Sequence, residues 1–249
     1  MKLGKDFEIV GGLPILYVKR LDAIVCSDLH LGYEGVMAGR GAFLPKVNLS
    51  RIKGMLKQAV EKTGAGRIII DGDIKNEFSK VHLEEFNELR EMVDFVREEL
   101  DVKRITLVKG NHDNFVDRIK GRLGIEIFES EALLGGMLFF HGEGLPEAKG
   151  YSSMVMGHVH PAIAIYNGLG VKEKFHCFLY GKTRKGSAEA IVLPAMNYFA
   201  EGVAVNLEDV KGMAPVFRSI IDIRRMRAIC IGEGEALDFG TVEQLSKLK

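Results

Sequence analysis

The chain is organised around a β-forming run that closes in a polar turn, Arg104-Ile105-Thr106-Leu107-Val108-Lys109-Gly110-Asn111-His112-Asp113. A strand that ends in glycine and then in an amide, an imidazole and a carboxylate presents three functional side chains at the rim of a sheet. Ligands of open α/β sheets are usually held at this rim. Taken alone, residues 110–113 also suit an ordinary surface turn, so their function depends on what the rest of the chain brings to the same place.

Polar turns of the same kind follow two other β-forming runs, Leu21 to Ser27 with Asp28-Leu29-His30, and Arg67 to Ile70 with Asp71-Gly72-Asp73. On an extended segment, side chains two residues apart point the same way. We therefore expect Asp28 and His30 to face one point while Leu29 turns to the core. Two carboxylates at a buried strand end are costly unless a cation compensates them, and Asp73 is the expected ligand.

The second half of the chain adds three histidines at expected strand ends. Residues 132–134 and 137–140 are predicted to pair as a hairpin that delivers His141. The apolar run 151–156 leads into Gly157-His158-Val159-His160, where two imidazoles are again two residues apart. Both rings can therefore converge on one site.

Five of the seven histidines thus stand at predicted strand ends, namely His30, His112, His141, His158 and His160. Neutral imidazole and carboxylate are ligands that suit Zn, Mn, Fe or Ni. The sequence offers no pair of closely spaced cysteines for a structural thiolate site. The mixed set of His, Asp and Asn therefore predicts a catalytic metal site.

A Gly-rich loop is expected at residues 32–45, and amphipathic helices are expected at 48–62 and 83–100. A short exposed helix is expected at 241–249. Asn48 or Ser50 is expected to cap the first helix. Further strands are expected at 162–166, 175–179, 188–193, 202–205 and 227–231.

The composition indicates a soluble protein with one domain, residues 1–249. Hydrophobic residues make up 47% of the chain, and 34 basic side chains balance 34 acidic ones. The summed charge therefore gives no general attraction to nucleic acid or to an acidic membrane. Three widely spaced cysteines indicate a reducing, cytoplasmic setting. No apolar stretch approaches the roughly 20 residues of a membrane span.

Five motifs resemble, in order, the signature of the calcineurin-like metallophosphoesterases: Asp28-x-His30, Gly72-Asp73, Gly110-Asn111-His112-Asp113, His141 and Gly157-His158-x-His160. The resemblance implies an α/β (α+β) fold, a sandwich of two mixed β-sheets flanked by helices. It also implies that the site lies at the ends of the strands.

The resemblance assigns roles to these residues. It implies two divalent metal ions, with Mn expected first and Zn, Fe or Ni as alternatives. One ion would be held by Asp28, His30 and His160, and the other by Asn111, His141 and His158, with Asp73 bridging both. His112 resembles the family's catalytic histidine, and Asp113 the carboxylate that orients it.

Longer stretches resemble small archaeal phosphoesterases related to the SbcD nuclease and bacterial phosphoesterases associated with a DNA ligase. These stretches are residues 28–34, 43–45, 157–163, 177–179 and 193–195. At one position, where that subgroup has His, this chain has Asn76, which can bind a phosphate but cannot donate a proton as His can. Arg40, flanked by glycines, is either a phosphate contact or a plain surface arginine.

The residues and the resemblance together predict a metal-dependent phosphoric ester hydrolase. Two cations can lower the pKa of a bridging water and hold the hydroxide for in-line attack on phosphorus. We expect phosphodiester cleavage of a nuclease-like kind, on a phosphorylated small molecule or a nucleic acid, with a DNA-repair protein as partner. The alternatives are a phosphomonoesterase or nucleotide phosphatase, and a non-catalytic scaffold of the same fold.

Overall fold

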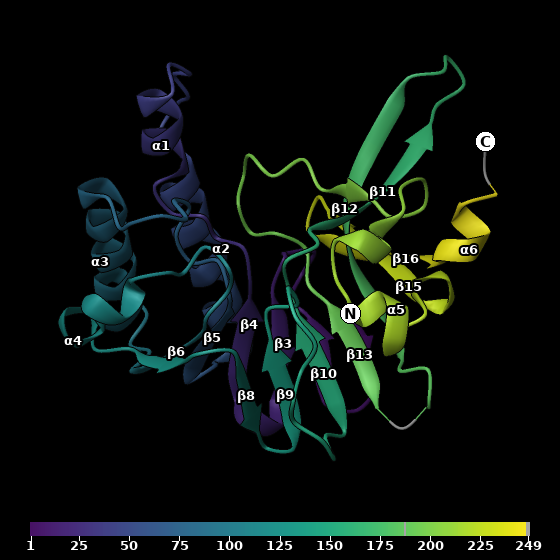
Figure 1. Ribbon diagram of the computed structural model, residues 1–249, viewed down its shortest axis with the longest axis horizontal. Helices are drawn as coiled ribbons and strands as arrows, with labels where there is room; N and C mark the ends of the chain where they lie inside the picture. Colours follow the sequence, from purple (N-terminus) through teal and green to yellow (C-terminus); the bar gives the residue numbers. More distant parts are fainter. Residues whose placement is uncertain (187, 248–249) are drawn as a thin grey trace.

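A computed structural model describes residues 1–186 and 188–247. It contains two β-sheets packed face to face with helices outside them (Figure 1). The first sheet follows chain order and comprises β1 (Lys2–Leu3), β2 (Phe7–Ile9), β3 (Leu16–Val18), β4 (Ala23–Cys26), β5 (Arg67–Asp71), β6 (Arg104–Val108) and β7 (Glu126–Phe128). Strands β1 to β4 are antiparallel and β4 to β7 are parallel.

The second sheet is also mixed. It comprises β8 (Glu131–Leu134), β9 (Met137–Phe140), β10 (Ser153–Met156), β11 (Pro161–Tyr166), β12 (Lys172–Lys182), β13 (Glu189–Val192), β14 (Val203–Ala204), β15 (Arg227–Gly232) and β16 (Glu235–Thr241). Strands β9, β10 and β13 are parallel neighbours, and the hairpin β8–β9 forms as expected. The predicted sandwich of two mixed sheets is confirmed.

Successive side chains of a buried strand point alternately to the helices outside and to the other sheet, and both directions are packed with apolar residues. In β5, Ile68 and Ile70 pack under α2 (Asn48–Thr63) and α3 (Leu83–Glu98), whereas Ile69 faces the second sheet. Ile69 shares the cluster between the sheets with Phe139 and Phe178. The outer face of the second sheet is covered in turn by a segment that includes α5 (Val216–Ser219). The remaining helical turns are η1 (Lys19–Leu21), η2 (Val116–Arg118), α4 (Lys120–Leu123), η3 (Val210–Gly212), η4 (Ile223–Arg225) and α6 (Val242–Leu245).

The segment 32–45, predicted to be a loop, contains the helix α1 (Tyr33–Gly39), so that prediction is wrong for residues 33–39. Contacts with other elements stabilise this helix despite its glycines. The carboxylate of Glu34 accepts hydrogen bonds from the backbone N–H groups of Val47 and Asn48, at 3.0 and 2.8 Å. A Cβ at position 35 would meet the carboxylate of Glu84, so glycine leaves room for that side chain beside α1.

Two helix ends also differ from the sequence prediction. Asn48 does not cap α2; it is buried, and its side-chain amide bonds with the carbonyl oxygen of Leu29 and the N–H of Tyr198. The helix expected at 241–249 is the short α6, which is not wholly exposed because Val242 and Leu245 are buried. Residues 248–249 lie outside the described part of the chain. The strand β16 was not anticipated.

The fold brings the carboxyl ends of parallel strands from both sheets together. Strands β4, β5 and β6 end on the same side of the first sheet, and β9, β10 and β13 on the same side of the second. A parallel bridge between Ser27 and Ala195 joins the two ends. Among the described helices, none is long and apolar enough to cross a membrane.

Candidate metal centre

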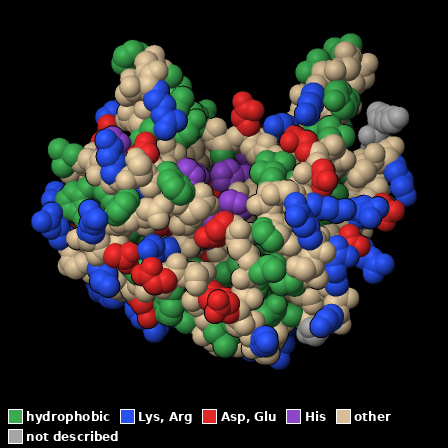
Figure 2. Space-filling model, viewed as in Figure 1, with side chains coloured by type: hydrophobic (Ala, Val, Ile, Leu, Met, Phe, Trp, Pro, Cys, Tyr) green, Lys and Arg blue, Asp and Glu red, His purple; other side chains and the backbone are tan. Residues whose placement is uncertain are grey.

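Turns after five strands place histidine and aspartate side chains in three overlapping clusters. Within each cluster the donor atoms lie within 4.8 Å of one another. The clusters are Asp28 with His30 and His160, Asp73 with His141 and His158, and His30 with Asp73 and His112. Figure 2 shows histidine side chains gathered in a hollow between two projections, which Figure 1 identifies as α1 and the β11–β12 hairpin.

The backbone brings these side chains together in a way that the sequence did not predict. Asp28 and His30 have φ angles of 56° and 45°, and His158 and His160 have φ angles of 69° and 48°. The expected extended segment is therefore wrong, and each ligand pair stands on left-handed backbone. This conformation costs roughly 1–2 kcal/mol per non-glycine residue, a cost typically found at functional sites.

Hydrogen bonds between the turns hold this strained backbone. The N–H of Asp28 donates to the carbonyl oxygen of Gly72 at 3.0 Å, and the N–H of His30 donates to that of Asp73 at 2.9 Å. Asp73 itself has a φ of 52°. The turns after β4 and β5 are therefore fixed to each other by backbone hydrogen bonds.

The first cluster centres on the buried carboxylate of Asp28. Nε2 of His160 lies 2.9 Å from one of its oxygens, and the Ser27 hydroxyl donates to the other at 2.6 Å. Burial alone would raise the pKa of Asp28, but the imidazoles of His160 and His141 hold it below its ordinary range. Burial lowers the pKa of His30 to about 4, so its ring is neutral at pH 7, as a metal ligand must be.

In the second cluster, His141 is oriented by the strand next to it. Its Nδ1 lies 2.9 Å from the carbonyl oxygen of Asp71 and must carry a hydrogen, because a carbonyl only accepts. Its Nε2 then faces a carboxylate oxygen of Asp73 at 3.1 Å and one of Asp28 at 3.7 Å. Burial would lower the pKa of His141, but these two carboxylates hold it well above its ordinary value.

A buried amide oxygen provides a test of whether a cation fits. Oδ1 of Asn111 is among the buried polar atoms of the described residues that have no hydrogen-bond partner. Leaving a buried polar atom unpaired costs about 1–3 kcal/mol. Amide oxygen, imidazole nitrogen and carboxylate together form a donor set for divalent metals. The residues present therefore fit divalent metal ions, and the role of Asn111 as a ligand stays a prediction.

His112 lies at the edge of the clusters, and its ring is oriented by a backbone group. Its Nδ1 is 2.5 Å from the carbonyl oxygen of Asn76, so Nδ1 is the nitrogen that carries a hydrogen. Its backbone N–H donates to Asp73 at 2.9 Å. These contacts fix His112 relative to the turn after β5.

Asp113 has different partners from those expected. Its buried carboxylate accepts from the backbone N–H groups of Asp73, Ile74 and Gly110, at 2.8, 3.0 and 2.9 Å. Burial and the Asp73 carboxylate raise its pKa to about 7. In the described contacts Asp113 therefore ties two ligand-bearing turns together, whereas Asn76 orients the His112 ring.

The two predicted substrate contacts lie beside this centre. Arg40 follows α1, is largely exposed, and has a guanidinium nitrogen 3.6 Å from a carboxylate oxygen of Glu77. Asn76 contributes its carbonyl oxygen to His112. Contact of either residue with a substrate stays a prediction.

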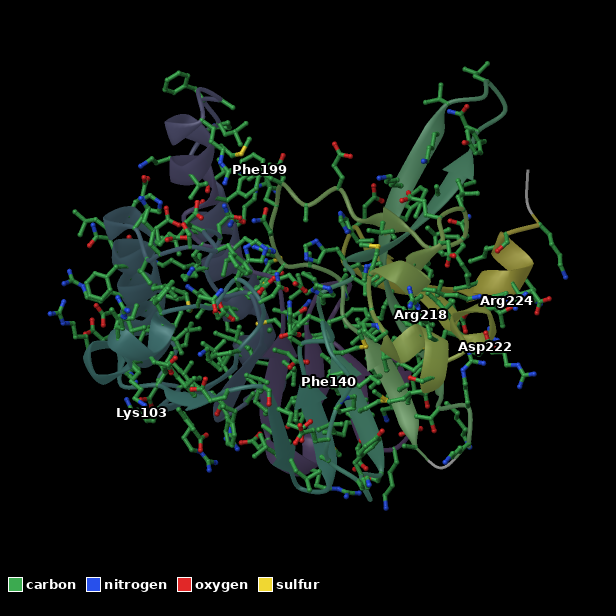
Figure 3. The ribbon with its side chains drawn as sticks, in the orientation of Figure 1. Lys103, Phe140, Phe199, Arg218, Asp222 and Arg224 are labelled. Atoms are coloured by element: carbon green, nitrogen blue, oxygen red, sulfur yellow. The ribbon has the colours of Figure 1, made fainter. Side chains whose placement is uncertain are left out.

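Several supporting residues escaped the sequence analysis. Asn48 and Asn197 both donate to the carbonyl oxygen of Leu29, between the ligands Asp28 and His30. Asparagine in a helix or loop gives no signal of such a role, because the contact joins residues far apart in the chain. Figure 3 shows Phe199 of the same segment beside α1, where its ring stacks on Tyr33 with centroids 5.4 Å apart.

Among the solved structures that this chain resembles, a nuclease supports the fold, and a second match is weaker. Nuclease MPE of Pseudomonas putida is 16% identical over 94% of each chain, with a TM-score of 0.64. A phosphoesterase from E. coli, YfcE, is 18% identical over 73% of this chain and 83% of its own, with a TM-score of 0.42. A search of curated proteins finds no match.

The sequence also matches a family model. The match covers residues 22–183, more than half of the chain, and the model describes calcineurin-like phosphoesterases. The matched range contains every turn that contributes to the three clusters. The chain therefore belongs to the calcineurin-like phosphoesterase family.

Proposed function

We propose that this protein is a phosphodiesterase that depends on two divalent metal ions and cleaves substrates in the manner of a nuclease. The carrying observation is the set of three clusters, two of which share Asp73 and two of which share His30, together with the unpaired Oδ1 of Asn111. Asp28, His30 and His160 would hold one ion, Asn111, His141 and His158 the other, and Asp73 both. When bound, such ions supply a water of lowered pKa and neutralise the phosphoryl oxygens.

The chain itself would supply the proton for the leaving group. The carbonyl oxygen of Asn76 occupies Nδ1 of His112, which leaves Nε2 as the nitrogen that can give a proton to a bound substrate. As the phosphorus–oxygen bond breaks, the leaving oxygen would take that proton. General acid catalysis of this kind contributes typically about 10²- to 10⁴-fold in rate.

The preference for a diester rests on the sequence resemblance of residues 28–34 and 157–163 to SbcD-related and ligase-associated phosphoesterases. The nuclease from P. putida shares the fold over 94% of this chain, which agrees with that choice. Manganese is the first ion to test because carboxylate, amide and imidazole ligands all suit it.

The test is metal analysis of the purified protein coupled to a manganese-supplemented assay with bis-p-nitrophenyl phosphate beside p-nitrophenyl phosphate. We expect two bound ions and faster cleavage of the diester. Faster cleavage of the monoester would replace the diester proposal with a phosphatase. Failure to bind metal after reconstitution, with no turnover of either compound, would refute the enzyme and leave a scaffold.

A variant separates the proposed roles. His112→Ala should keep both ions and lose rate on a phosphodiester with a poor leaving group. Asp73→Ala should lose metal first. If His112→Ala retained the full rate on an unactivated diester, the role assigned to His112 would be wrong.

A further inference from the structure

The loop 76–82 is held from one side by the carboxylate of Glu85. Glu85 is fully buried near the start of α3 and accepts hydrogen bonds from three backbone N–H groups of the loop. The donors are Asn76 at 3.1 Å, Glu77 at 2.5 Å and His82 at 2.8 Å. Hydrogen bonds to an ionised group are roughly twice as strong as neutral ones. A rigid helix therefore fixes both ends of the loop.

The same loop is held from the other side by Lys75. Its side chain is fully buried, and its ammonium group donates to the carbonyl oxygens of Glu77 and Lys80. Glu85 binds N–H groups of the loop, and Lys75 binds its carbonyls. The opposite charges of Glu85 and Lys75, both buried, thus hold residues 76–82, which have no regular secondary structure.

The loop in turn holds His112. Asn76 offers its carbonyl oxygen to Nδ1 of the ring at 2.5 Å. Phe78 packs edge-on against the same ring, with centroids 6.0 Å apart and an interplanar angle of 88°. Both contacts move with the loop, and neither comes from a predicted metal ligand.

The side chain of Glu85 is closely packed against the backbone of Gly32. A Cβ at Gly32 would lie 2.3 Å from Cγ of Glu85, and Gly32 has a φ of 79°. Glycine is therefore required where the backbone after His30 passes over Glu85. Glu85 therefore packs directly beside the turn that carries Asp28 and His30, although it is not itself a predicted ligand.

We propose that Glu85 is a positioning residue for His112, acting through the loop and the Asn76 carbonyl. This inference rests on the proposed function. With Nδ1 bound to the carbonyl, a second proton on the ring can only be on Nε2. A hydroxide, formed from water that has given one proton to solvent, forms its bond to phosphorus through oxygen while the bond to the leaving oxygen breaks. The leaving oxygen takes the Nε2 proton, and the ring is left neutral with its hydrogen on Nδ1. When the hydrogen bonds of Glu85 are lost, the loop 76–82 no longer fixes the His112 ring, which can then rotate. Proton donation fails, while the predicted metal ligands remain in place.

The dependence on the leaving group tests this chain of contacts. A p-nitrophenolate leaves without a proton, whereas an alkoxide needs one. Glu85→Gln keeps one acceptor oxygen but sets an amide NH₂ against at least one of the three N–H donors. We expect it to lose about 10-fold or more on an alkyl phosphodiester, within the general-acid range. On bis-p-nitrophenyl phosphate it should stay within about 3-fold of the unmodified protein, since general acid assistance is small there. Glu91→Gln, at an exposed position of the same helix, is the matched control and should change neither rate.

A double-mutant cycle identifies the route of the effect. If Glu85 acts through His112, Glu85→Gln should change neither rate further in a His112→Ala background. Lys75→Gln, which releases the loop from the other side, should reproduce the same leaving-group dependence if the first variant folds poorly. An equal loss on both substrates, or an additive loss in the double variant, would overturn the proposal.

One readout does not depend on turnover. ¹⁵N-histidine spectra of the metal-free protein should show the Nδ1–H form for His112, assigned by its absence from His112→Ala, and a mixture of forms in Glu85→Gln. An unchanged His112 signal in Glu85→Gln would refute the positioning role even if the protein hydrolyses nothing. Absence of metal-dependent turnover with an altered signal would instead refute the proposed function alone.

Discussion

Replacing Gly110 by alanine places a methyl carbon inside the ligand cluster. The added Cβ would lie 2.4 Å from Oδ1 of Asp73, 2.6 Å from Cδ2 of His141 and 2.8 Å from the backbone nitrogen of Asp73. The φ of Gly110 is outside the left-handed region, so the penalty is steric and does not come from the backbone. The methyl group must displace a carboxylate and an imidazole that we assign to the metals.

The magnitude follows from these contacts. Forcing a methyl group into a packed site costs typically about 1–3 kcal/mol of unfolding free energy. Shifting groups that place metal ligands costs about 10- to 100-fold in metal affinity. Gly54→Ala is the matched control, because its Cβ meets nothing within 4 Å on the exposed face of α2. It should gain roughly 0.5–1 kcal/mol through helix propensity.

Urea unfolding of the metal-free proteins and calorimetric titration with Mn²⁺ measure both quantities. Gly110→Ala should unfold at lower urea and bind Mn²⁺ more weakly, whereas Gly54→Ala should unfold at higher urea and bind Mn²⁺ normally. A folded Gly110→Ala protein with unchanged Mn²⁺ affinity would show that Asp73 and His141 do not hold an ion where we place it.

Three further predictions use the same protein. Asp113→Asn should lower the free energy of unfolding by about 1–3 kcal/mol in urea titrations, because its amide NH₂ would face backbone N–H donors; an unchanged midpoint would contradict the bridging role. Mn²⁺ at 100 times its Kd should add about 2.7 kcal/mol to that free energy and raise the melting temperature, and this gain should vanish in Asp73→Ala. The three cysteines are buried, and burial raises the pKa of Cys26 to about 12, so its thiolate fraction at pH 8 is on the order of 10⁻⁴. A disulfide reagent at pH 8 should therefore label the folded protein slowly, and urea should expose all three thiols to rapid labelling.

Much of the site could be predicted from sequence because its residues follow strands. Residues 23–26 and 68–70 are continuous and apolar, as strands buried on both faces are, and residues 104–109 are strongly β-forming. The carboxyl ends of parallel strands meet, so the chemistry of each turn implied a shared site. The clusters confirm that the histidines and aspartates converge.

The geometry within the turns could not be predicted in the same way. Asp28 and His30 adopt left-handed backbone that glycine would favour, and the hydrogen bonds that their N–H groups donate to the turn after β5 help to compensate the cost. The helix α1 likewise depends on contacts of Glu34 with residues more than ten positions away. Contacts between residues far apart in the chain stabilise both the left-handed turns and α1, and such contacts leave no local pattern in the sequence.

The group that orients His112 was hidden for a different reason. The family resemblance implies a side chain, Asp113, as the orienting group, but the ring bonds to the backbone carbonyl of Asn76. Every residue has such a carbonyl, so its use depends on where a loop lies. The loop position in turn depends on Glu85, which reads in the sequence as an ordinary residue of a helical first turn.

The left-handed ligand turns have a consequence for how the centre is loaded. Asp28, His30, Asp73, His158 and His160 have φ angles between 45° and 69°, and backbone hydrogen bonds join the turns of Asp28 and His30 to the turn after β5. Because protein groups make these bonds, we expect the turns to keep this backbone when an ion is removed. One divalent ion should then replace another without refolding the protein.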